Sequence, residues 1–97
     1  MIERHVTFHV ISGKGKEFEN HFKNEYSIAM SKQPGFVSVT LLKEQEKEAV
    51  YQMTIRFQSL ETAAAWRDSA DHKALSPQIK ALYNESMVQV YDVTAQR

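Results

Sequence analysis

Hydrophobic and polar residues alternate over the first segment of the chain, residues 2–11. Its mainly apolar side carries Ile2, Arg4, Val6, Phe8 and Val10. Its polar side carries Glu3, His5, Thr7 and His9. A period of two predicts a β-strand with one buried face. The polar run 12–15 contains two glycines and ends this strand.

The hydrophobic period changes to that of a helix from Lys16 onward. One apolar stripe consists of Phe18, Phe22, Ala29 and Met30, with Tyr26 and Ile28 at its edges. Polar side chains lie between these positions, as on a helix with one solvated face. Because Pro34 disfavours helical backbone at Gln33, and Gly35 favours a turn, we predict that the helix ends at about Lys32.

Alternation predicts two more strands, at residues 36–45 and 50–57. Within the second of these, one face carries Tyr51, Met53, Ile55 and Phe57. The charged run 44–48 lies between the two strands and predicts a solvated hairpin tip, because neighbouring lysines neutralise its glutamates.

A second helical region is predicted to begin after Ser59, whose side chain suits the N-cap position. Residues 63–67 have high helix propensity. Ser76 followed by Pro77 has the pattern of a new helix start, so we predict a break near Ala74 and a further helix through Tyr83. Alternation over residues 87–93 predicts the last strand.

The predicted order β-α-β-β-α-β defines an α+β, ferredoxin-like fold in a single domain, residues 1–97. Such a fold has a four-stranded antiparallel sheet with both helices on one face. The uncovered face would carry His5, Thr7, His9, Ser38, Thr40, Leu42, Gln52, Thr54 and Arg56. This mixed surface is either an open polar face, which antiparallel sheets allow, or the interface of a homodimer in which two sheets pack together.

Composition excludes several classes of function. The 97 residues have a formal net charge of zero and include no cysteine. The balanced charge argues against binding to nucleic acid or to an anionic membrane, and no apolar stretch is long enough to span a bilayer. Without cysteine there is no disulfide, thiolate or cysteine-based zinc site. Because the first residues lack a signal-peptide pattern, we expect a cytoplasmic protein.

Trp66 and the histidines are the candidates for chemistry. Trp66, the only tryptophan, is either a core residue or one wall of an aromatic-binding pocket with an available indole N–H. His5 and His9 lie about 13 Å apart along a strand, too far to share a metal ion, and we expect no metal. His72 suits acid–base work because imidazole titrates near neutral pH, although a surface histidine is the simpler interpretation.

Several segments together carry a resemblance to a known family. They are Val6-Thr7-Phe8-His9-Val10 followed by Gly13-Lys14, Phe18 and Phe22, Gln33-Pro34-Gly35-Phe36, Tyr51-Gln52-Met53, Phe57-Gln58-Ser59, Ala63-Ala64-Ala65-Trp66, and His72. With them the chain resembles the antibiotic biosynthesis monooxygenase family of dimeric α+β barrel proteins over nearly its whole length. The resemblance implies a homodimer whose two sheets form a joined barrel, with a pocket between sheet and helices in each subunit. Some members of this family oxidise phenols to quinones with molecular oxygen and use neither metal nor flavin, and the resemblance implies this activity here as well.

The resemblance also suggests site residues. Trp66 matches the pocket tryptophan, His72 falls where some members carry a tyrosine, and Thr62 falls where some carry an asparagine. Our candidate catalytic residues are therefore Trp66 and His72. Our candidate substrate-binding residues are Val6, Tyr51, Met53, Phe57 and Thr62.

The function we expect is cofactor-independent monooxygenation of a small aromatic or quinol-type substrate. The zero net charge fits an uncharged substrate. A non-catalytic small-molecule-binding or stress-response homodimer of the same fold is the alternative. Haem binding or degradation is a weaker alternative, because Val6 stands where haem-degrading relatives carry an asparagine and Ser76 lies near the position of their histidine.

Overall fold

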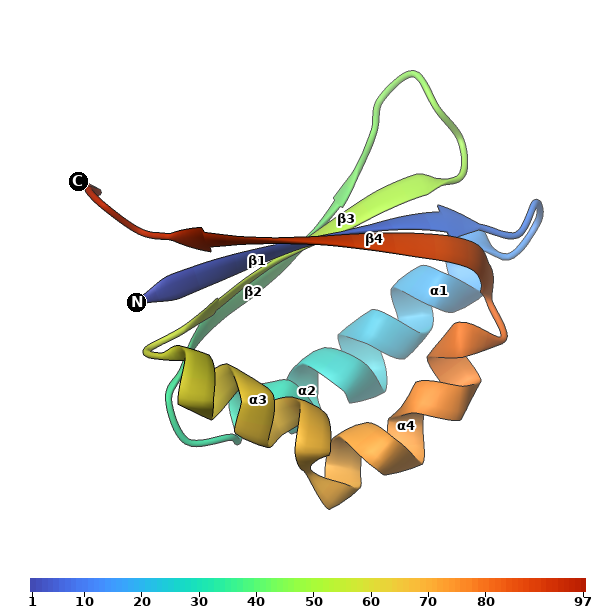
Figure 1. Cartoon of the computed structure of the whole chain (residues 1–97). Coiled ribbons are helices and arrows are strands. Elements are labelled where there is room, and N and C mark those ends of the chain that lie inside the picture. Colours follow the sequence, from blue (N-terminus) through green and yellow to red (C-terminus); the bar gives the residue numbers. More distant parts are fainter.

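The computed structural model describes all 97 residues and contains one four-stranded antiparallel sheet with every helix on the same face (Figure 1). The strands are β1 (Ile2–Val10), β2 (Phe36–Lys43), β3 (Val50–Phe57) and β4 (Tyr83–Asp92). They lie in the order β2-β3-β1-β4, and each neighbouring pair is antiparallel. The predicted ferredoxin-like α+β fold is confirmed.

The first helical region has the predicted extent but not the predicted regularity. It consists of α1 (Gly15–His21), a π-helical segment η1 (Phe22–Tyr26) and α2 (Ser27–Ser31). A π-helical turn inside an α-helix is rare and often accompanies a functional site. Here it ends at Tyr26, which is buried.

The second helical region is broken at Ser69, so the prediction of a break near Ala74 was wrong. Helix α3 spans Leu60–Asp68 and α4 spans Ala70–Lys80. Ser69 has extended backbone, and its hydroxyl accepts the N–H of His72, which makes it the N-cap of α4. Pro77 lies inside α4, where it lacks only the N–H that would bond to the carbonyl of Lys73.

Strand β4 begins at Tyr83, four positions before the predicted start at Met87. It is an edge strand whose side chains are almost all exposed, so its first half has no hydrophobic alternation. Its backbone nevertheless pairs with β1 from Tyr83 opposite Val10 to Asp92 opposite Ile2. Strand β2 is two residues shorter than predicted, with an irregular register between Phe36 and Ser38.

The hydrophobic core lies between the sheet and the helices. The largest side chains that are fully buried there are Trp66, Phe18, Phe57, Met30 and Met53. The opposite face of the sheet has no covering element in this chain (Figure 1). Both termini lie at one end of the sheet, where the N–H of Val93 donates to the carbonyl of Met1.

Candidate functional site

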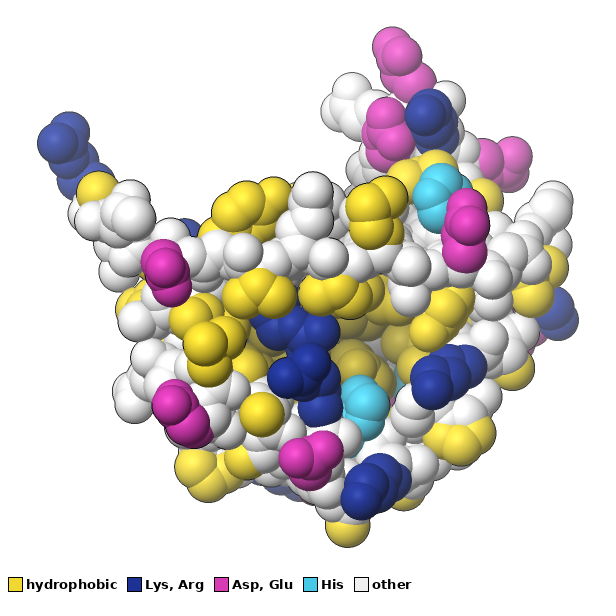
Figure 2. Space-filling model, in the orientation of Figure 1, with side chains coloured by type: hydrophobic (Ala, Val, Ile, Leu, Met, Phe, Trp, Pro, Cys, Tyr) yellow, Lys and Arg dark blue, Asp and Glu magenta, His cyan; other side chains and the backbone are white.

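A cavity of about 150 Å³ lies between the helix-covered face of the sheet and the segments η1, α3 and α4. Its apolar surfaces include Val6 and Phe8 from β1, Met53 and Ile55 from β3, and Ile79 from α4. It is partly open to solvent, and Figure 2 shows a hollow between sheet and helices in which basic side chains and a histidine lie in front of apolar ones. This combination of apolar walls and a few polar groups is typical of a small-molecule site.

Three aromatic rings meet at one side of the cavity. The rings of Trp66 and His72 lie 5.0 Å apart at a steep angle, and those of Trp66 and Tyr26 lie 5.5 Å apart in a similar edge-to-face contact. The ring of His72 is also 6.1 Å from that of Tyr26. Trp66 is only 1% exposed, so it acts both as a core residue and as a wall of the cavity.

Ser69 holds two of these rings in place through the helix break. Its hydroxyl donates to the carbonyl of Trp66 at 2.7 Å and accepts the backbone N–H of His72 at 3.1 Å. Trp66 lies near the end of α3, and His72 lies in the first turn of α4. The break that the sequence pattern misplaced is therefore what brings His72 against Trp66.

Positive charge dominates the polar lining of the cavity. Arg4 projects from the otherwise apolar face of β1, and its Nε is fully buried without a hydrogen-bond partner. Arg67 and Lys80 are exposed residues at the border of the cavity. No aspartate or glutamate lines the cavity, and none of these three cations is in a salt bridge.

These surroundings shift the protonation of two lining residues. Burial lowers the pKa of His72 below its usual value of 6.5, and the charges of Lys80, Arg4 and Arg67 lower it further, with Asp68 opposing them. Burial raises the pKa of Tyr26 to about 12. At neutral pH the imidazole of His72 is therefore neutral and able to accept a proton, and the phenol of Tyr26 keeps its proton.

The structure brings together four of the residues chosen from sequence. Val6, Met53, Trp66 and His72 all line the cavity. The other three candidates, Tyr51, Phe57 and Thr62, lie outside it.

The contacts of these three residues explain where they lie. The hydroxyl of Tyr51 donates to Glu19 on α1 at 2.5 Å. Phe57 is fully buried, with its ring 5.9 Å from that of Phe36. Thr62 forms a capping box with Ser59 at the start of α3.

Four lining residues were not predicted from the sequence: Arg4, Tyr26, Arg67 and Lys80. A signal existed for Arg4, because a charged residue on the buried face of a strand is rare unless it is paired. Tyr26 was assigned only to the edge of a helical stripe, and the π-helical segment could not be read from the pattern. Arg67 and Lys80 look like ordinary surface residues until the fold places them around one cavity.

No group of three or more histidine, aspartate or glutamate side chains is arranged to hold a metal ion. None of the helices has the length and apolar character needed to cross a membrane.

The chain matches one known protein family over most of its length. Residues 1–78 match the model of the antibiotic biosynthesis monooxygenase family, and the chain belongs to that family. The resemblance deduced from sequence is thereby confirmed. A comparison with curated proteins gives no match.

Solved structures show the same fold. A variant of SnoaB, described as a cofactor-independent oxygenase from Streptomyces nogalater, is 21% identical with a TM-score of 0.87, covering 98% of this chain and 94% of that one. Another SnoaB structure is 23% identical with a TM-score of 0.85, covering 99% and 93%. A conserved protein from Methanosarcina mazei is 20% identical with a TM-score of 0.82, covering 93% and 89%.

Proposed function

We propose that this chain is a cofactor-independent monooxygenase that oxidises a small aromatic or quinol-type substrate with molecular oxygen. The observation that carries the proposal is the meeting of Trp66, His72 and Tyr26 in one partly enclosed, mainly apolar cavity. Membership of the monooxygenase family and the shared fold with SnoaB support it. The small cavity favours a substrate of one or two rings.

His72 is the proposed base. Its imidazole is neutral at physiological pH, since burial lowers its pKa, so one ring nitrogen can take the proton of a substrate hydroxyl. The positive side chains around the cavity then stabilise the phenolate that forms. Tyr26 keeps its proton and can donate a hydrogen bond to a substrate oxygen.

The oxidation itself uses the electrons of the substrate. The deprotonated ring gives one electron to oxygen, and the resulting radical and superoxide combine into a ring peroxide. This peroxide takes back the proton held by His72 and becomes a hydroperoxide. Loss of water from this intermediate leaves a quinone, so one phenol and one oxygen molecule give one quinone and one water. The apolar walls exclude bulk water from the reactive intermediates, and Trp66 positions the ring by an edge or face contact.

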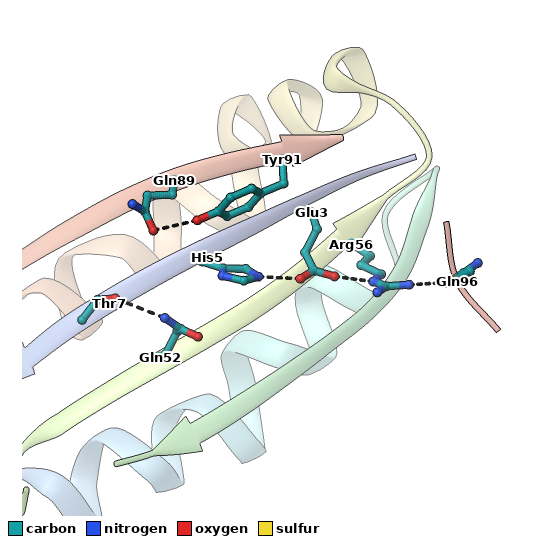
Figure 3. Close-up of polar contacts among 8 residues, drawn as sticks. All are labelled: Glu3, His5, Thr7, Gln52, Arg56, Gln89, Tyr91 and Gln96. Atoms are coloured by element: carbon teal, nitrogen blue, oxygen red, sulfur yellow. Dashed lines mark hydrogen bonds and ion pairs between the residues drawn. The ribbon is translucent and has the colours of Figure 1, made fainter. Parts of the chain in front are cut away.

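We also propose that the protein acts as a homodimer through the uncovered face of its sheet. On this face Glu3 accepts hydrogen bonds from both His5 and Arg56, and Arg56 also donates to Gln96 (Figure 3). The polar groups of these residues therefore already have partners, which lowers the cost of covering them.

Apolar surface on the same side of the sheet supports this dimer. Leu42 is 47% exposed, Met87 is 58% exposed and Tyr91 is 44% exposed. A second copy that packed there would bury this surface. Sedimentation at micromolar concentration should give a dimer, and a monomer would contradict this part of the proposal.

Oxygen uptake tests the proposed reaction. We would incubate the protein with a panel of naphthols, hydroxynaphthoates and hydroquinones and compare it with His72→Gln, which removes the base and keeps a polar side chain of similar size. His9→Gln is the matched control, since His9 lies on β1 facing away from the cavity. Because His9 lies on the proposed dimer face, sedimentation must first show that this variant keeps the oligomeric state of the wild type. Uptake by the wild type and His9→Gln, but not by His72→Gln, supports the proposal. No uptake above the His72→Gln level with any substrate refutes it and favours a binding protein instead.

A further inference from the structure

Arg4 is the one charged residue on the helix-covered face of β1, and nothing in the chain neutralises it. Its neighbours on that face, Ile2, Val6 and Phe8, are buried and apolar. Its Nε is fully buried without a partner, and no salt bridge involves its guanidinium. A buried donor without a partner costs free energy, so its presence calls for a partner that the folded chain does not contain.

Other positive charges surround the same space and increase this cost. Burial and the nearby charge of Arg67 lower the pKa of Arg4, yet a guanidinium stays protonated in a protein. Lys80 adds a third cation at the border of the cavity, and Figure 2 shows Lys and Arg side chains gathered at the hollow.

The nearby acidic groups do not compensate for these charges. Asp71 accepts a hydrogen bond from Gln33, and Asp68 is exposed outside the cavity. Glu3, although adjacent to Arg4 in sequence, points to the other face of the sheet and binds Arg56 there. The cavity is therefore cationic even though the whole chain has zero net charge.

We propose that the ligand of this cavity is an aromatic carboxylate, with its ring against the apolar wall beside Trp66 and its carboxylate bound to Arg4. The planar guanidinium offers paired N–H donors that match the two oxygens of a carboxylate. Most of the cavity lining is apolar, which suits a ring with a single small anionic group better than a strongly hydrated phosphate. It rests on the proposed function and names a substrate class for it, an anionic one in place of the uncharged substrate expected from the net charge.

Binding of two unreactive probes tests this inference without any turnover. 2-Naphthoate and 2-naphthamide have the same ring and nearly the same shape, but only the first is charged at about pH 7.5. Calorimetry should show that the wild type binds the acid at least about tenfold more tightly than the amide, as expected for a charge-assisted hydrogen bond. Because Trp66 is the only tryptophan, its single indole N–H resonance should shift on binding and so locate the probe.

Variants then assign the preference to Arg4. Arg4→Met keeps much of the side-chain length and should reduce the preference to within about twofold, while Lys47→Met, which removes one charge from the exposed β2–β3 hairpin, should keep it. Equal affinity of the wild type for acid and amide would overturn the inference. So would an unchanged preference in Arg4→Met, or tighter binding of 2-naphthyl phosphate than of 2-naphthoate.

Two further outcomes distinguish the proposed ligand class from the proposed dimer and from the proposed monooxygenase reaction. If Arg4→Met changed the oligomeric state, a carboxylate of a second subunit would be the partner of Arg4, and the inference would fail. If the acid bound with the predicted preference but no oxygen uptake were found for any aromatic acid, the ligand class would stand and the monooxygenase proposal would fail.

Discussion

Replacing Arg4 by methionine should stabilise the protein in the absence of ligand, although it weakens binding of the aromatic acid. The buried Nε of Arg4 lacks a partner, and an unmade hydrogen bond of this kind costs about 1–3 kcal/mol. Only Nε is fully buried and unpaired, which places the expected gain at the lower end of this range, about 1 kcal/mol. Methionine retains the apolar contacts of the arginine stem.

Thermal unfolding measures this effect. For a domain of this size, about 1 kcal/mol corresponds to a rise in Tm of about 4–8 °C, at a fixed protomer concentration. The control Lys47→Met should change the free energy of unfolding by no more than about 0.5 kcal/mol, since its side chain is exposed. At one fixed concentration, 2-naphthoate should then raise the Tm of the wild type more than that of Arg4→Met.

A fall in Tm on replacing Arg4 would refute this reasoning. It would mean that the guanidinium has a stabilising partner in solution and is not free to bind the carboxylate of a ligand. A gain in stability together with weaker binding of the acid is the pattern expected of a residue that is retained for function although it destabilises the fold.

Three more variants test other parts of the structure. The pKa of His72 is lower in the folded protein than its usual value of 6.5, so the unfolded chain takes up this proton more readily. We therefore expect the free energy of unfolding to fall as the pH falls through 6.5 and to level off below the folded-state pKa. Urea unfolding of His72→Gln should lack this part of the pH dependence. Gly35→Ala should destabilise the protein by at least about 1 kcal/mol in urea unfolding, because Gly35 has φ of 81° and a Cβ there would lie 2.5 Å from Thr62; an unchanged midpoint would show that the turn can relax. Ser69→Ala should cost about 1 kcal/mol by loss of the N-cap and should also shift the indole N–H resonance of Trp66, whereas an unshifted resonance would contradict the role of Ser69 in placing the ring.

The sheet could be predicted from sequence because its central strands have one buried and one open face. The alternation in β1 and β3 marks both the strands and the side that meets the helices. The edge strand β4 has no such alternation in its first half, and its start at Tyr83 is determined by backbone pairing with β1. The break between α3 and α4 was misplaced because Ser76-Pro77 has the pattern of a helix start, whereas Ser69 alone makes the capping bond.

The site could be predicted only in part, because the sequence pattern shows which face of a strand is buried but not which residues from different elements line one cavity. Trp66 and His72 stand out as the only tryptophan and as a histidine nearby in sequence, and both line the cavity. Tyr51 and Phe57 share a strand face with Met53, but a shared face does not mean a shared cavity: Tyr51 reaches Glu19 and Phe57 packs on Phe36. The cationic lining depends on three elements that only the fold brings together.

The balance between oxygen consumed, quinone formed and hydrogen peroxide released tests the central claim most directly, since monooxygenation and simple dehydrogenation differ in it. For the phenolic substrate of the panel that gives the fastest uptake, the account predicts one quinone per oxygen molecule, no peroxide detectable by added catalase, and no such reaction in His72→Gln. Stoichiometric release of peroxide, or the same rate and products with His72→Gln, would contradict the claim that this cavity is the active site of a monooxygenase.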